Sequence, residues 1–78
     1  MLSYMRVLIQ NCDTLQFFAA NNGWIGSPHE ATDYKGTLAA ARIIRQNELR
    51  RAQILLTFGN PELDIVLQVG ECKDLARN

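Results

Sequence analysis

Several residue types are scarce in this 78-residue sequence, and each shortage excludes a kind of site. The two cysteines, Cys12 and Cys72, form neither a CxxC motif nor the Cys/His spacing of a zinc site. We expect both to be free thiols, because one pair is too few for a disulfide framework. The single histidine, His29, and the scattered acidic residues do not have the close ligand spacing of a zinc site, and the five glycines form no phosphate-binding loop. The sequence therefore predicts no metal and no cofactor.

Net charge is also absent, since eight basic residues balance eight acidic ones. No overall field then draws the chain to nucleic acid or to an anionic membrane surface, so either role would need a local patch. A net charge near zero favours self-association over mutual repulsion. The charge balance therefore favours an oligomer.

Long hydrophobic runs are missing as well. No apolar stretch approaches the roughly 20 residues that cross a bilayer, and Arg6 interrupts the apolar segment nearest the N-terminus. Residues 1–11 also lack the charged start and long apolar centre of a signal peptide. We therefore expect no membrane partner and a cytoplasmic location.

What is present is the composition of an ordinary globular protein, with 47% hydrophobic and 21% charged residues. A chain of this length forms one domain with a small core. We expect a single domain over residues 1–78, in which the polar residues 70–78 form a loose tail.

Alternating apolar residues predict four strands, at residues 5–11, 15–19, 52–58 and 64–69. Turn-forming residues separate the two strands of each pair, at residues 11–14 and 59–62. After the second strand, Gly23 permits a tight turn from which Trp24 and Ile25 return as a short extended piece. The strands therefore form two hairpins.

A helix is expected between the two hairpins. Residues 38–49 place alanines and isoleucines on one side and arginines on the other, as an amphipathic helix does. Thr37 is expected to cap this helix, and Ser27 to cap a single earlier turn in a Ser-Pro-His-Glu capping box. The fold is then α+β, with the order β-β-α-β-β and one helix on one face of a four-stranded antiparallel sheet. A right-handed crossover gives the strand order 2-1-3-4.

The sheet face opposite the helix, which we call the open face, is the main candidate for function. If the strand registers align, one apolar residue of each strand points out of this face, within a frame of glutamines and charged residues. These residues are Leu8, Phe18, Leu55 and Val66. An apolar centre with a polar rim is typical of a protein interface. Scattered surface hydrophobes and partial cover by the tail are the alternatives.

A basic cluster is the second candidate. Arg42 and Arg45 occupy the outer helix face, and Arg50 and Arg51 follow the helix, so four of the eight basic residues gather at one end. Such a patch can contact the phosphates of a nucleic acid. The alternative is a solvated helix face on which Arg45 pairs with Glu48.

Candidate catalytic groups are few. His29 is close in sequence to Glu30 and Asp33, and Cys12 could supply a nucleophile, yet no nucleophile elbow such as GxSxG is present. Glu30 and Asp33 lie one helical turn apart, but the capping box already accounts for Glu30. We therefore expect no enzyme, unless one deep pocket brings His29, Asp33 and Cys12 together.

One pattern in the chain resembles a group of short bacterial proteins. These proteins share a β-hairpin, a Trp, a Glu-Ala-x-Asp-aromatic motif, a helix and a closing hairpin. The matching positions are Trp24, residues 30–34, the helix from Leu38, and the strands around residues 54–58 and 65–69. The resemblance implies the fold, and it implies no activity because the group has none assigned.

The sequence thus favours a small non-catalytic protein-interaction module, which binds itself as a homodimer or binds another protein through the open face. Nucleic-acid binding through the arginine cluster is the alternative. The first hypothesis depends on the apolar stripe, and the second predicts an affinity that falls steeply with salt.

Overall fold

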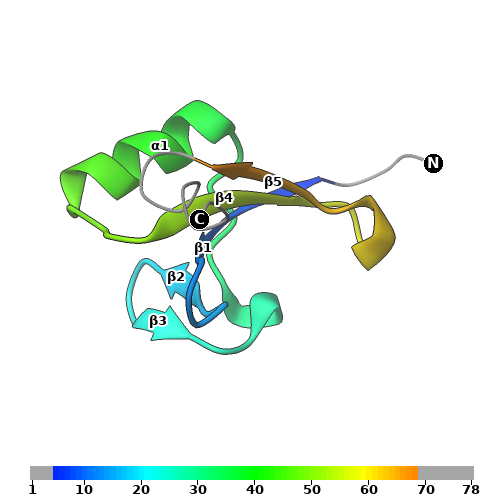
Figure 1. Cartoon of the computed structure of the whole chain (residues 1–78), viewed down its shortest axis with the longest axis horizontal. Helices are drawn as coiled ribbons and strands as arrows, with labels where there is room; N and C mark the ends of the chain where they lie inside the picture. The colour runs from blue at the N-terminus through cyan, green and yellow to red at the C-terminus, as the bar shows by residue number, and fades with distance from the viewer. Residues whose placement is uncertain (1–4, 69–78) are drawn as a thin grey trace, which may run out of the picture.

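The computed structural model describes residues 5–68, which form a five-stranded antiparallel sheet with one α-helix on one face (Figure 1). The elements follow the predicted order, with one extra strand and two short 3-10 helices. In chain order they are β1 (Arg6–Asn11), β2 (Phe17–Ala19), β3 (Gly23–Ile25), η1 (Pro28–Glu30), α1 (Thr37–Gln46), β4 (Ala52–Thr57), η2 (Pro61–Leu63) and β5 (Ile65–Gln68). The predicted tail at residues 70–78 lies outside the described residues.

The strand order of the sheet is β3-β2-β1-β4-β5, and every neighbouring pair is antiparallel. The α+β fold is therefore confirmed, and the four predicted strands lie in the predicted order 2-1-3-4. The strand count needs correction, because β3 adds a fifth strand beside β2. Gly23, with a φ of 74°, lets the chain turn back so that Trp24 pairs with Phe18.

The turn between β1 and β2 is longer than the sequence pattern predicts. Leu15 was expected to begin the second strand, but it has a φ of 64° and belongs to the turn. The Asn11 side chain holds the turn, since its Oδ1 accepts hydrogen bonds from the N–H groups of Asp13 and Thr14. As a result, β2 begins at Phe17.

This turn decides which phenylalanine faces which side of the sheet. Residues that pair across antiparallel strands point to the same face. Phe17 is opposite Gln10, which is on the open face, so Phe17 also faces away from α1 and Phe18 faces towards it. The prediction that Phe18 points out of the open face is therefore wrong, because the longer turn shifts the alternation of β2 by one residue.

The side of the sheet that faces α1 holds the larger core. The helix packs mainly on β1 and β4, and the fully buried Ala40 lets its backbone approach them closely. Burial of a side chain such as Ile54 contributes about 1.5–3 kcal/mol. The buried members are Val7, Ile9, Ala40, Ala52 and Ile54, and partly buried residues such as Trp24, Tyr34, Ile43, Ile44 and Leu56 surround them.

The open face carries a second, smaller cluster. Leu8, Phe17 and Leu55 are buried there together with Ala31, which belongs to the loop after η1. This loop therefore covers part of the face that the sequence predicts to be open. Leu8 and Leu55, expected at a solvated surface, are 0% and 8% exposed.

The edge of β1 that β2 leaves uncovered is closed by residues 31–34, which we call the edge clip. The Val7 N–H donates a hydrogen bond to Asp33 Oδ1 at 3.0 Å, and the Tyr34 N–H donates to the Val7 carbonyl at 2.8 Å. The Tyr34 hydroxyl donates to the Phe18 carbonyl at 3.1 Å and ties the clip to β2. These bonds satisfy backbone groups of a strand edge. The Glu-Ala-x-Asp-aromatic motif thus has a structural role.

Two predicted helix caps are not formed. Ser27 is the N-cap residue of η1, but its side chain makes no capping hydrogen bond. The helix α1 begins at Thr37, so its N-cap residue is Gly36. In their place, Pro28 fixes the first residue of η1, and packing on the sheet holds α1.

The carboxylate of Asp33 is charged and held by backbone donors. Burial acts to raise the pKa of Asp33, but hydrogen bonds from the N–H groups of Val7 and Lys35 outweigh it and leave the pKa below its ordinary value of 3.8. The positive charges of Lys35 and Arg6 act in the same direction. Folding therefore stabilises the ionised form of Asp33 relative to its protonated form.

We predict that Asp33→Ala lowers the free energy of unfolding by about 1 kcal/mol or more, because the Val7 N–H loses its acceptor. Because the pKa of Asp33 is lowered in the folded state, its contribution is present above the ordinary pKa and is lost as the pH falls through the folded value. The difference between wild type and Asp33→Ala should therefore shrink in acid. Denaturant unfolding at neutral and at acid pH measures it.

The matched control is Glu30→Gln, which removes an exposed carboxylate from the same loop. This variant should keep the wild-type stability at neutral pH. Equal losses in Glu30→Gln and Asp33→Ala would contradict the role of the edge clip.

Candidate functional site

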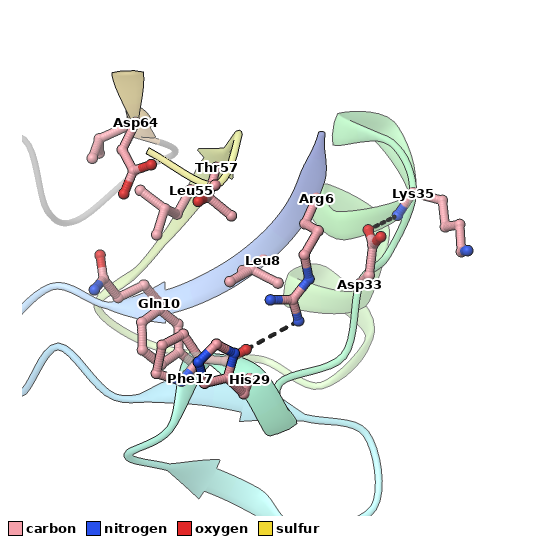
Figure 2. Close-up of a pocket in the computed structure, with 13 residues that line it drawn as sticks. Arg6, Leu8, Gln10, Phe17, His29, Asp33, Lys35, Leu55, Thr57 and Asp64 are labelled. Atoms are coloured by element: carbon pink, nitrogen blue, oxygen red, sulfur yellow. Dashed lines mark hydrogen bonds between the residues drawn. The ribbon is translucent and has the colours of Figure 1, made fainter. Parts of the chain in front are cut away.

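A concavity of about 990 Å³ lies over the open face (Figure 2). Its floor is apolar and consists of side chains from four strands: Leu8 of β1, Phe17 of β2, Leu55 of β4 and Val66 of β5. Leu8 pairs with Leu55, and Leu55 pairs with Val66, so these three residues form one row across the sheet. The row contains three of the four residues of the predicted stripe.

The floor is exposed unevenly. Phe17 and Leu55 are 7% and 8% exposed, Leu8 is fully buried, and Val66 is 44% exposed. The structure therefore brings together Leu8, Leu55 and Val66 as predicted and places Phe17 beside them. Phe18 is on the other side of the sheet, where its ring packs against Trp24.

The loop that contains η1 forms one wall of the concavity, with Pro28, His29, Asp33 and Lys35 among the lining residues. Arg6 anchors this wall, because its Nη2 donates hydrogen bonds to the Pro28 and Ala31 carbonyl oxygens, both at 3.0 Å. The guanidinium group thus joins β1 to the loop. The sequence pattern predicts only a single capped turn in this segment, and the structure places the loop beside the floor.

Polar side chains complete the rim, and their charges are mixed. Arg6 and Lys35 are cationic, whereas Asp33 and Asp64 are anionic. At the far end from Arg6, Gln53 Nε2 donates to Gln10 Oε1 at 2.9 Å, and this bond satisfies the amide of a buried Gln53. A ligand that fits this rim needs apolar groups at its centre and both signs of charge at its border.

The candidate catalytic residues do not meet in this concavity. His29 and Asp33 line it, but Cys12 is not among its lining residues and lies in the turn after β1. The Asp33 carboxylate already accepts hydrogen bonds from two backbone N–H groups. The condition set for an enzymatic site, one pocket lined by His29, Asp33 and Cys12, is therefore not met.

Cys12 differs from its predicted state. It is disulfide-bonded, so the expectation of a free thiol is wrong for this residue. Its Sγ lies 3.1 Å from the Arg51 carbonyl oxygen. Cys72, the other predicted thiol, lies outside the described residues.

The four arginines of the predicted cluster do not share one environment. Arg42 and Arg45 are exposed on α1, where they border a small groove of about 230 Å³. Arg51 forms a bidentate ion pair with Asp13, with Nε to Oδ2 and Nη2 to Oδ1 distances of 3.0 Å. This hydrogen bonding holds the pKa of Asp13 below its ordinary value. Arg50 is exposed and follows the helix, as expected.

Two classes of feature are not found in residues 5–68. No group of three or more His, Cys, Asp or Glu side chains there could hold a metal ion. None of the helices described there has the length and apolar character needed to cross a bilayer.

Comparison with known proteins gives no relatives. No protein-family model matches the chain, and no curated protein or solved structure matches it significantly. The assignment of the site therefore depends on its own geometry.

Sequence reasoning missed two parts of the site, and only one of them left a signal. Phe17 and Phe18 are adjacent and chemically identical, so either could face outwards, and the choice depended on the length of the preceding turn. The wall formed by His29, Asp33 and Lys35 left no comparable signal. Its position follows from hydrogen bonds to a distant strand, which no local pattern encodes.

We predict that the single tryptophan reports which phenylalanine lies on the helix side of the sheet. The rings of Trp24 and Phe18 have centroids 5.3 Å apart at an interplanar angle of 67°. Phe18→Leu removes this edge-to-face partner and should change the near-ultraviolet circular dichroism of Trp24. The matched variant Phe17→Leu should leave the tryptophan signal close to that of wild type, and the reverse result would contradict the assigned faces.

Proposed function

We propose that this protein is a small non-catalytic interaction module that binds a protein partner through the concavity of its open face. The observation that carries the proposal is the apolar row of Leu8, Leu55 and Val66 at the floor of a concavity of about 990 Å³. Interfaces between proteins commonly have such an apolar centre within a polar rim. The partner can be a second copy of the chain or another protein.

The size of the concavity suits either a small molecule or a segment of a protein, and its border of mixed charge favours the segment. Ligand pockets have volumes of about 300–1,000 Å³, so this one can receive a few apolar side chains. Its rim has two cations and the Asp33 carboxylate on the side of β1 and the η1 loop, and a second anion, Asp64, next to β5. A peptide with apolar anchors and flanking charges of both signs complements this arrangement.

A non-catalytic role agrees with how the polar groups of the rim are used. The Arg6 guanidinium binds two carbonyl oxygens, and the Asp33 carboxylate binds two backbone N–H groups. Both side chains thus maintain the shape of the wall. This use supports recognition by shape and apolar contact.

Nucleic-acid binding through Arg42, Arg45, Arg50 and Arg51 stays the alternative prediction. The ion pair between Arg51 and Asp13 neutralises one charge of that cluster, so we place this function second.

A cytoplasmic location likewise stays a prediction. The disulfide at Cys12 counts against it, because structural disulfides are rare in reducing compartments.

We predict that peptides selected from a random displayed library against the folded protein bind in the concavity. In nuclear magnetic resonance titrations, the backbone amides of Leu8, Leu55 and Val66 should show the largest shifts. Thr57→Tyr, which adds a ring at a half-buried lining position, should weaken binding by about tenfold or more, equal to about 1.4 kcal/mol. Leu55→Asp is unsuitable, because it would bury a charge and unfold the chain.

The matched control is Gln46→Tyr, which adds the same ring at an exposed position of α1. This variant should bind the peptides as tightly as wild type. If the selected peptides shift amides of α1 in place of the floor, or if Thr57→Tyr binds them unchanged, the concavity is not the binding site.

A further inference from the structure

The edges of the sheet are protected unequally. The exposed part of β1 is closed by the edge clip, and β3 at one end of the sheet has only three residues. At the other end, β5 has a partner strand on one side only, within the described residues. An open strand edge is a template for pairing with another strand.

The hydrogen bonds of β1 fix the direction in which its backbone groups point. The N–H and C=O of Val7 bond to the edge clip, so they point away from β4. The backbone N–H and C=O groups of successive residues point to opposite sides of a strand. Those of Leu8, the next residue, therefore point towards β4. Leu8 pairs with Leu55, which makes these two a hydrogen-bonded pair.

The same alternation continues through β4 into β5. Because Leu55 bonds to β1, the backbone groups of Ile54 and Leu56 point towards β5. Their partners, Leu67 and Ile65, use their own N–H and C=O groups in those bonds. The N–H and C=O of Val66, which lies between them, therefore point away from β4, towards the edge that has no partner strand within residues 5–68.

The side chains around this edge are apolar and exposed on both faces of the sheet. Ile65, Val66 and Leu67 are 46%, 44% and 37% exposed. Val66 lines the open face, whereas Ile65 and Leu67 lie on the side of α1, whose main contacts are with β1 and β4. Within residues 5–68 the helix makes fewer contacts with β5 than with β1 and β4 at the centre of the sheet.

We propose that β5 pairs antiparallel with β5 of a second copy of this chain, around a two-fold axis at Val66. The Val66 N–H then donates to the carbonyl of the second copy's Val66, and the reverse bond forms by symmetry. Ile65 lies opposite the second copy's Leu67 on the helix side, and the two valines meet on the open face. The two sheets become one continuous sheet.

The occupant of the edge is a second copy because this register is self-complementary. Each apolar residue meets an apolar residue, and the sequence of β5 contains no charged residue that would face its own copy. Lysine and proline, which commonly protect strand edges from pairing, are absent from β5. The zero net charge of the chain removes long-range repulsion between copies.

This contact goes beyond the proposed function, because it uses backbone groups of the edge and leaves the concavity open. Sedimentation velocity at increasing protein concentration tests it, and wild type should convert from monomer to dimer. Val66→Pro removes only the outward N–H and keeps the bonds of β5 to β4, so it should weaken the dimer by about tenfold or more with an unfolding temperature close to wild type. Val66→Thr, a β-branched control with its N–H intact, should still dimerise.

Amide hydrogen exchange of wild type gives a second, independent measurement. The Val66 amide should exchange more slowly as the concentration rises, whereas the amides of Ile65 and Leu67 are protected at every concentration. A strict monomer at all concentrations, a dimer that persists in Val66→Pro, or Val66 exchange that does not depend on concentration would each overturn the proposal. Thr57→Tyr should dimerise normally, which separates this result from a failure of the concavity to bind peptides.

Discussion

The two hydrogen bonds between Val7 and the edge clip are the contact on which the rest of this structure depends. They close the edge of β1 at the point where β2 no longer covers it. They also fix the loop after η1 beside the sheet, so that Ala31 packs on the open face. A few residues after the edge clip the chain reaches the helix side of the sheet, where α1 begins. One short contact thus organises both sides of the sheet.

The open face is shaped by groups whose first role is to hold the chain together. Arg6 and Asp33 belong to the wall, and the charged group of each is hydrogen-bonded to backbone atoms. What remains for a partner is an apolar floor and a border of mixed charge. Recognition at such a surface depends on shape and on removal of apolar area from water, to which charges at the border add selectivity.

The parts of the fold that depend on local alternation could be predicted from the sequence. In β1, β4 and β5 the positions that face the helix side recur as apolar residues at every second place, and Leu8, Leu55 and Val66 lie in one row as expected. Leu15 is the residue at which the apolar pattern of β2 fails, because an apolar residue close to two phenylalanines is typical of a strand. In the structure Leu15 is 58% exposed and occupies a left-handed conformation that no apolar pattern reveals.

The wall of the concavity could not be predicted, because the interactions that position it join distant parts of the chain. Val7 and Asp33 are 26 residues apart, and the Asp33 carboxylate accepts a hydrogen bond from the backbone N–H of Val7. Every residue type except proline offers a backbone N–H, so the sequence around Val7 does not reveal this hydrogen bond. The local capping pattern at Ser27 also gave a sufficient but incorrect explanation for the same segment.

The turn between β1 and β2 has a consequence for how this fold can diversify. Since Leu15 sets the alternation of β2, removal of one residue from that turn would exchange the positions of Phe17 and Phe18 without any change in the strand itself. The residue presented on the open face is then selected by the length of a loop. Variation among such proteins can therefore alter a binding surface through insertions and deletions outside it, and the helix-facing core would receive the complementary change.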